Sequence, residues 1–122
     1  MNRCRLLIVD DRTRAREGLK ALLGTMPLVQ VVGEAADGQE AMHLAEEQRP
    51  DVVLTDATMP VMDGLEATQP IKAEWPKVRV VILTVHSPLR AEALTAGADA
   101  FLVKGCPAEL LLAAILDLQE EQ

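Results

Sequence analysis

The sequence predicts an α/β fold built around one open parallel sheet. Short apolar runs of strand length alternate with segments whose apolar residues recur at helical spacing, which is typical of repeated β-α units. The chain has 122 residues, enough for one domain with a single hydrophobic core. We therefore expect residues 1–122 to form one domain of five β-α repeats.

The repeats can be followed in order along the chain. Strands are expected at residues 5–9, 29–34, 51–55, 80–83 and 100–103. Helices are expected at residues 14–23, 38–48, 65–74 and 87–96, with a last one running from residue 107 nearly to the acidic end. Gly24 and Gly97 end the first and fourth helices, because glycine readily adopts the backbone conformation found after a helix. Pro50 ends the second helix, and Pro88 begins the fourth in its first turn.

Two of the expected helices carry unusual features. Pro70 lies inside the third, where it removes one hydrogen bond and should kink or divide the helix, at a cost of about 3 kcal/mol if the helix were regular. The last helix carries five apolar residues that we expect to face inward, namely Leu110, Leu111, Ala114, Ile115 and Leu118. Leu110, Leu111 and Leu118 leave a homodimer interface open as an alternative, although the core is the more common place for such residues.

Composition and charge argue against several classes of protein. The formal net charge is −7, with one Trp, one Phe and no Tyr, which argues against this domain gripping a nucleic-acid backbone or stacking bases. Two cysteines, Cys4 and Cys106, are too few for a disulfide framework or a zinc site, so a reducing cytosol is expected. No apolar stretch approaches a membrane span, and the N-terminus lacks the apolar core of a signal peptide. We expect a cytoplasmic protein without membrane contact.

Polar residues follow four of the expected strands at the point where each strand ends. Asp10 and Asp11 follow the first, Asp56 the third, Thr84 the fourth and Lys104 the fifth. In a parallel sheet all of them reach the carboxyl edge, where open α/β sheets bind ligands. Three close carboxylates repel one another, and a hard divalent cation with oxygen ligands, Mg2+ best of all, relieves that repulsion. An amine and a hydroxyl across the site suit the oxygens of a phosphoryl group, so Asp56 is a candidate nucleophile that becomes an aspartyl phosphate.

These residues resemble the receiver domain of two-component response regulators. The resemblance covers the whole chain and rests on Asp10-Asp11, on Asp56 followed by Met59-Pro60 and Asp63-Gly64, on Thr84, and on Phe101 three residues before Lys104. It implies the flavodoxin-like, CheY-like fold, a doubly wound five-stranded parallel sheet of order 2-1-3-4-5 with five helices. Residues 96–104 and 107–111 are most similar to the NarL/FixJ (LuxR-type) subgroup, whose receivers commonly precede a helix-turn-helix output domain. No such domain is present in these 122 residues.

The resemblance also implies roles for individual residues. Asp56 would accept a phosphoryl group from a sensor histidine kinase or a small phosphodonor. Asp11 and Asp56 would bind Mg2+ directly, Asp10 would act largely through a bound water, and the backbone carbonyl of Thr58 would be the third protein ligand. Lys104 would contact the phosphoryl group. The domain would be a phosphoacceptor that assists its own phosphotransfer and dephosphorylation, not an enzyme acting on other substrates.

A conformational switch is implied as well. Thr84 would swing its hydroxyl toward the phosphoryl group, and the ring of Phe101 would turn into the space left behind. The surface formed by the fourth helix, the fifth strand and the fifth helix would then change, as a population shift between two packings with transcription as the expected output. A lone aromatic in an apolar strand is also commonly plain core, so Phe101 keeps both interpretations.

Three features depart from the family pattern. Val85 is bulkier than the small residue usual after Thr84, which suggests narrowed access to the phosphoryl site and slow phosphorylation or hydrolysis. The stretch from Thr84 to Gly97 is slightly short, so we expect a truncated or reshaped fourth helix. Gly105 follows Lys104 where proline is frequent, so a cis bond is not assumed there.

Other interpretations remain open. Asp10 and Asp11 could be helix caps, and the basic cluster Arg12, Arg14 and Arg16 is most simply a solvated face. A degenerate receiver that serves as a phosphate-independent interaction module would have the same fold. A haloacid-dehalogenase-like phosphatase would need a second aspartate two residues after the nucleophile, and Arg12 and Thr58 occupy the corresponding positions after Asp10 and Asp56. A flavin carrier fits less well, because no Gly/Ser/Thr-rich phosphate loop follows the first strand.

Overall fold

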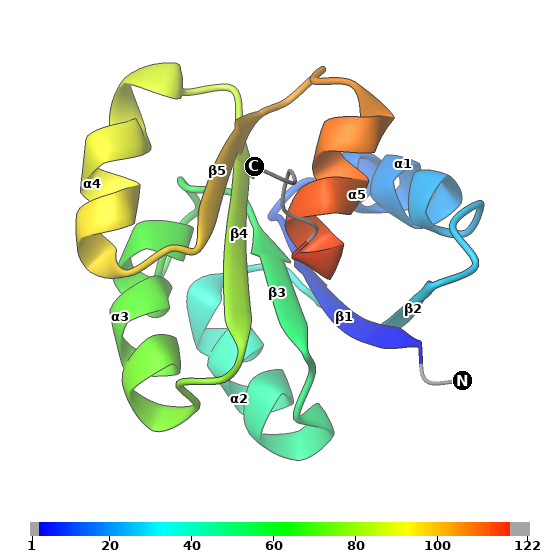
Figure 1. The fold of residues 1–122 in the computed structure, drawn as a ribbon. Coiled ribbons are helices and arrows are strands. Elements are labelled where there is room, and N and C mark those ends of the chain that lie inside the picture. Colours follow the sequence, from blue (N-terminus) through cyan, green and yellow to red (C-terminus); the bar gives the residue numbers. More distant parts are fainter. Residues whose placement is uncertain (1–2, 118–122) are drawn as a thin grey trace.

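The computed structural model describes residues 3–117, which form one five-stranded parallel sheet flanked by helices (Figure 1). The elements run β1 (Cys4–Val9), α1 (Thr13–Leu23), β2 (Val29–Ala35), α2 (Gly38–Gln48), β3 (Val52–Thr55), α3 (Gly64–Glu74), β4 (Arg79–Thr84), a 3-10 turn η1 (Ser87–Leu89), α4 (Arg90–Ala96), β5 (Ala100–Val103) and α5 (Ala108–Leu116). The strand order is β2-β1-β3-β4-β5 with every pairing parallel. The doubly wound α/β sheet implied by the resemblance is therefore confirmed.

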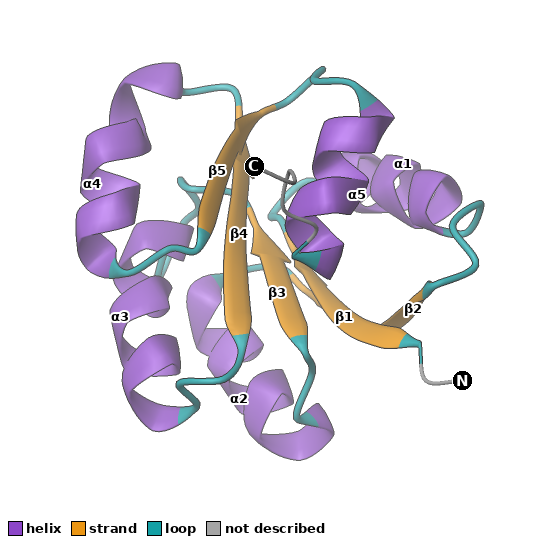
Figure 2. Ribbon diagram, viewed as in Figure 1, coloured by secondary structure: helices purple, strands orange, loops and turns teal. Residues whose placement is uncertain are grey.

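The helices cover both faces of the sheet. Figure 2 shows α1 and α5 on one face and α2, α3 and α4 on the other. Successive residues of a strand point to opposite faces, so Leu6 and Ile8 pack toward α1 and α5 while Leu7 and Val9 pack toward the other three helices. Because neither face meets water, the central strands are continuous apolar runs, which is what made them visible in the sequence.

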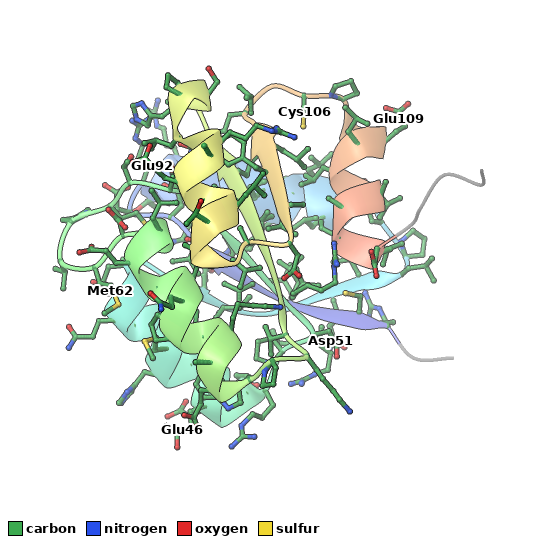
Figure 3. All side chains as sticks on the ribbon, turned by 60° about the vertical axis from the view of Figure 1, so that its left-hand side comes forward. Glu46, Asp51, Met62, Glu92, Cys106 and Glu109 are labelled. Carbon is green, nitrogen blue, oxygen red and sulfur yellow. The ribbon has the colours of Figure 1, made fainter. Side chains whose placement is uncertain are left out.

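Several acidic residues lie on the outer surfaces of the helices. Glu46 on α2, Glu92 on α4 and Glu109 on α5 are all exposed (Figure 3). Acids also begin two of the helices, since the side chain of Asp37 accepts a hydrogen bond from the N–H of Glu40 at α2, and Asp63 forms a reciprocal capping box with Glu66 at α3. No helix within residues 3–117 is both long and apolar enough to cross a membrane.

Two expectations about the helices need correction. Helix α3 is continuous from Gly64 to Glu74, so of the two expected outcomes, a kink or a division at Pro70, the division does not occur. The capping box and the burial of Ala67 and Ile71 on either side of the proline hold both halves in one helix, which outweighs the missing hydrogen bond. In α5, Leu110 is 53% exposed and does not face inward, while Leu111 and Ile115 are buried as expected.

The remaining expectations about helices have mixed outcomes. The fourth helix is reshaped as expected, since η1 precedes a seven-residue α4. The expectation for Leu118 falls outside the described residues. Within residues 3–117 no peptide bond is cis, and Gly105 after Lys104 has a φ of 95°, a conformation that glycine accommodates without strain.

The backbone of Gly64 packs closely against the backbone of Asp56, the predicted nucleophile. A Cβ at this position would overlap the carbonyl oxygen of Asp56 and lie 2.9 Å from the hydroxyl of Thr55. We expect Gly64→Ala to lower the free energy of unfolding by about 3 kcal/mol or more, because buried backbone would have to shift. Gly18, in the middle of α1 with nothing within 4 Å of its missing side chain, is the matched control. Gly18→Ala should raise stability by about 1 kcal/mol in urea unfolding, and equal effects of the two substitutions would contradict this account.

Candidate functional site

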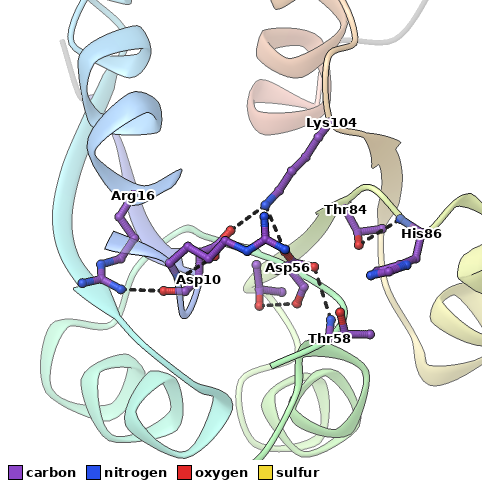
Figure 4. A network of polar contacts seen from close by, with 9 residues as sticks. Asp10, Arg16, Asp56, Thr58, Thr84, His86 and Lys104 are labelled. Atoms are coloured by element: carbon purple, nitrogen blue, oxygen red, sulfur yellow. Dashed lines mark hydrogen bonds and ion pairs between the residues drawn. The ribbon is translucent and has the colours of Figure 1, made fainter. Parts of the chain in front are cut away.

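The carboxyl edge of the sheet brings two aspartates and one lysine together. The ammonium Nζ of Lys104 lies 2.8 Å from Oδ2 of Asp10 and 3.0 Å from Oδ2 of Asp56 (Figure 4). Asp10 follows β1, Asp56 follows β3 and Lys104 follows β5, so the three arrive from strands far apart in sequence. Asp10 is 1% and Asp56 7% exposed. Two buried carboxylates thus share one cation.

Asp10 is held by the site and does not cap a helix. Its Oδ1 accepts a hydrogen bond from the backbone N–H of Arg12 at 2.9 Å, while its Oδ2 faces Lys104. Arg12 is the residue directly before α1, and its side chain makes no hydrogen bond that caps the helix. The alternative that the acid pair serves only as helix caps is therefore not supported by the geometry.

The surroundings of Asp56 favour its charged form. Burial would raise the pKa of this carboxyl, but hydrogen bonds from Lys104, from the Thr84 hydroxyl and from the N–H of Thr58 outweigh burial and hold the pKa below its ordinary value. Burial likewise would lower the pKa of Lys104, and its contacts with Asp10 and Asp56 raise it instead. Asp56 and Lys104 are therefore charged at neutral pH, and Asp56 needs no base to become a nucleophile.

Thr84 closes the site from the neighbouring strand. It is fully buried at the end of β4, and its Oγ1 accepts a weak hydrogen bond from the backbone N–H of His86 at 3.3 Å (Figure 4). The backbone N–H of Lys104 donates to the carbonyl of Thr84 at 2.9 Å, which fixes the ends of β4 and β5 side by side. His86 and Val85 are both exposed in the loop that follows.

Phe101 lies inside the core in this structure, at 4% exposure. The guanidinium of Arg90, the first residue of α4, sits 5.7 Å from the centre of its ring, within the range of a cation-π contact. Arg90 also donates a hydrogen bond from Nη1 to the carbonyl of Phe101 at 3.2 Å. The aromatic predicted as a switch is therefore packed inward and tied to α4.

The metal ligands expected from the sequence are only partly assembled. Asp11 and Thr58 are exposed beside the buried pair, and within residues 3–117 no three acidic, histidine or cysteine side chains are arranged to hold a metal ion as they stand. The available donors are carboxylate and carbonyl oxygens, which suit Mg2+. The ammonium of Lys104 bridges the two carboxylates where a cation is needed.

One residue of the site was missed by the sequence analysis. Arg16, interpreted as part of a solvated basic face, is only 18% exposed along its side chain and donates from Nη1 to the carbonyl of Asp10 at 2.6 Å (Figure 4). The single sequence signal that could have indicated this contact is the place of Arg16 in the first turn of the helix that directly follows the acid pair.

The loop after Asp56 contains a strained residue. Val61 has a φ of 71°, and the N–H of Met62 donates to the carbonyl of Pro60 at 2.9 Å, so the three residues form a tight γ-turn. A β-branched residue is disfavoured in this conformation. Val61 is also 76% exposed, so no packing compensates for the strain locally.

Comparison with known proteins assigns the class of protein. Residues 6–116 match the family described as response regulator receiver domain, and the chain belongs to this family. It is thus a receiver domain of two-component response regulators, a family that mostly transmits signals without catalysis.

Individual members of the family that resemble this chain include transcriptional regulators. The chain is 40% identical over 114 residues to the transcriptional regulatory protein LnrK of Bacillus subtilis (strain 168), covering 92% of this chain and 52% of LnrK. A two-component response regulator of the LuxR family from Aurantimonas sp. SI85-9A1 matches with a TM-score of 0.87 and 38% identity over 96% of this chain and 86% of that one. The chain spans about half the length of the curated relatives it matches.

A second similar structure was solved together with ligands. The CheY of a CheX-CheY complex from Borrelia burgdorferi, solved with beryllofluoride and magnesium, matches with a TM-score of 0.83 and 26% identity over 96% of this chain and 90% of that one.

The charges of Asp56 and Lys104 predict how stability depends on pH. Asp56 has a lowered pKa, so its contribution to the free energy of unfolding is present above about pH 4 and is lost as pH falls through the folded value. Lys104 has a raised pKa, so its contribution is present below about pH 10 and is lost as pH rises through the folded value. In urea unfolding across pH, Asp56→Asn should flatten the acid-side decline relative to wild type. Equal acid-side slopes would contradict the assignment.

The γ-turn predicts a stabilising substitution. Asparagine tolerates positive φ better than valine does, and Val61 contributes little packing, so Val61→Asn should raise the free energy of unfolding by about 1 kcal/mol. Val85, exposed and outside the set of residues with positive φ, is the matched control. Urea unfolding that shows the same gain for Val85→Asn, or no gain for Val61→Asn, would refute the strain.

Proposed function

We propose that this receiver is activated by phosphorylation of Asp56 and that a sensor histidine kinase is its phosphodonor. The observation that carries the proposal is the placement of Asp56 between a second buried carboxylate, Asp10, and the ammonium of Lys104. A nucleophile held in its ionised form beside an ammonium group is suited to accepting a phosphoryl group.

The proposed transfer uses groups already in place. An oxygen of the Asp56 carboxylate forms a bond to phosphorus while the bond from phosphorus to the donor's histidine nitrogen breaks, and that nitrogen keeps the electron pair. Lys104 then neutralises phosphoryl oxygens, and the Thr84 hydroxyl donates to another. Mg2+, when bound, would supply further charge neutralisation at these oxygens. Asp11, Asp56 and the carbonyl of Thr58 would hold the ion directly.

Asp10 would complete that metal site largely through a bound water. Its Oδ2 is occupied by Lys104 in the present structure, so binding of a cation and departure of the ammonium from Asp10 are naturally coupled. The beryllofluoride and magnesium in the Borrelia CheY complex support the same pair of ligands here.

Phosphorylation would be transmitted through Thr84 and Phe101. Once the Thr84 hydroxyl turns to the phosphoryl group, the ring of Phe101 gains room to repack, and its link through Arg90 carries the change to α4. Exposed apolar residues on α4, β5 and α5 provide the surface that would change, namely Leu94, Val103 and Leu110. That surface would act on a partner.

The output is inferred from the relatives. LnrK and DegU are transcriptional regulatory proteins about twice as long as this chain. We infer that transcription is the regulated process, that a helix-turn-helix output domain accompanies this receiver in the full-length protein, and that the receiver itself makes no direct contact with nucleic acid. Homodimerisation through α5 stays an open alternative, and the cytoplasm is the expected location.

Labelling with a small phosphodonor tests the proposal. We expect Mg2+-dependent incorporation of phosphate from phosphoramidate in wild type and its loss in Asp56→Asn, since Asp56 is the proposed phosphoacceptor and is held in its ionised form beside Lys104. Asp63→Asn is the matched control, because asparagine also caps a helix and labelling should persist. Absence of labelling in wild type, with beryllofluoride also failing to bind in the presence of Mg2+, would favour the phosphate-independent interaction module.

Val85 is expected to slow the chemistry. Val85 follows Thr84 directly and is exposed. If its bulk narrows access to the phosphoryl site, Val85→Ala should accelerate phosphorylation or hydrolysis of the aspartyl phosphate severalfold. Val103→Ala, which truncates another exposed valine, should leave both rates unchanged. Time courses of phosphate incorporation and loss measure both rates. Unchanged rates in Val85→Ala would show that the bulk of Val85 does not narrow access to the site.

A further inference from the structure

We propose that Arg16 is a positioning residue that orients the Asp10-Asp11 turn and thereby sets the affinity of this receiver for Mg2+. The inference rests on the proposed metal site and adds a residue outside the set expected to touch the ion. It is carried by the contacts of the Arg16 guanidinium, which link α1, β2 and the end of β1. Figure 4 shows the contact with Asp10.

The guanidinium reaches three oxygens in different directions. Nη1 donates to the carbonyl of Asp10 at 2.6 Å, Nε donates to Oε1 of Glu34 at 2.9 Å, and Nη2 lies 3.4 Å from the hydroxyl of Thr13. Glu34, on β2, is itself held by Lys20 at 2.6 Å. The planar fork of arginine can satisfy separate partners at once, whereas a lysine ammonium on a flexible stem lacks this fixed geometry.

The bond to the Asp10 carbonyl completes the fixation of that residue. The N–H of Asp10 donates to the carbonyl of Ala35 at 3.0 Å, its Oδ1 accepts from Arg12 and its Oδ2 from Lys104. With the carbonyl taken by Arg16, every polar atom of Asp10 has a partner. The residue is locked before any cation arrives.

The same bond orients the next residue. The peptide group between Asp10 and Asp11 is planar, so fixing the direction of the Asp10 carbonyl also fixes the plane from which Asp11 departs. Asp11 is exposed, and burial does not hold it in place. The contact with Arg16 is therefore a direct restraint on the backbone that would present Asp11 to the metal.

Charge and geometry make opposite predictions for Arg16. As a cation near an acidic site, Arg16 disfavours a second cation, so removing its charge would strengthen Mg2+ binding. As a positioning residue, it favours binding, so any change that breaks the fork weakens it. Arg16→Lys keeps the charge and loses the fork, while Arg16→Met loses both.

Isothermal titration of Mg2+ into the intact chain separates these effects. We expect Arg16→Lys to bind Mg2+ three- to tenfold more weakly than wild type, and Arg16→Met also to bind Mg2+ more weakly than wild type although it lacks the repelling positive charge. Lys20→Met, which removes a partner of Glu34 without touching Asp10, should stay within twofold of wild type. Glu34→Gln, which weakens the anchor of Arg16, should fall between wild type and Arg16→Lys.

Each result has a defined meaning. If Arg16→Lys binds Mg2+ with the affinity of wild type, or if Arg16→Met binds Mg2+ more tightly than wild type, the positioning role of Arg16 is overturned while the metal site stands. No binding by wild type overturns the metal site and the positioning role together. Thermal unfolding of each variant by circular dichroism checks folding, and if Arg16→Lys does not fold, Glu34→Gln decides by whether its affinity drops while Lys20→Met is unchanged.

Discussion

The sharing of one ammonium by two buried carboxylates is the constraint on which this structure depends. Asp10 and Asp56 cannot both be charged in a buried site without a nearby cation, and Lys104 supplies it from the opposite side of the edge. The balance is incomplete, since two negative charges meet one positive charge. The site therefore retains a demand for positive charge, which is the property that a metal-dependent phosphoacceptor needs.

The position of Lys104 connects this demand to the rest of the fold. Its backbone pairs with Thr84 at the end of β4, and three residues earlier the same strand carries Phe101, which Arg90 joins to α4. When the Lys104 ammonium changes partners, the change therefore takes place at the carboxyl end of β5. The Phe101 ring that packs inward lies on the same strand, three residues earlier. Short paths of this kind allow a local change of charge to favour another packing.

Much of the fold could be predicted from the alternation of apolar runs and helical segments in the sequence, and much of the site could then be predicted from the fold. Buried parallel strands are continuous apolar runs, and the residue after each run must reach the same edge of the sheet. The proximity of Asp10, Asp56 and Lys104 could therefore be predicted from the sequence. The errors arose where tertiary contacts decide. Leu110 was misplaced because α5 is apolar on nearly every side, which leaves its rotation undetermined. Arg16 was missed because its partner Glu34 is distant in sequence, and a run of basic residues is indistinguishable from a solvated face.

A crystal structure of the wild-type chain with beryllofluoride and Mg2+ would show whether the ammonium shared by Asp10 and Asp56 responds to a group bound on Asp56. We predict that Lys104 Nζ leaves Oδ2 of Asp10, now 2.8 Å away, and contacts a fluorine of the group on Asp56, with Mg2+ between the acids. A complex in which beryllofluoride is bound on Asp56 while Lys104 still bridges both carboxylates would contradict it, because the shared ammonium would then not be the element that responds to the phosphoryl group.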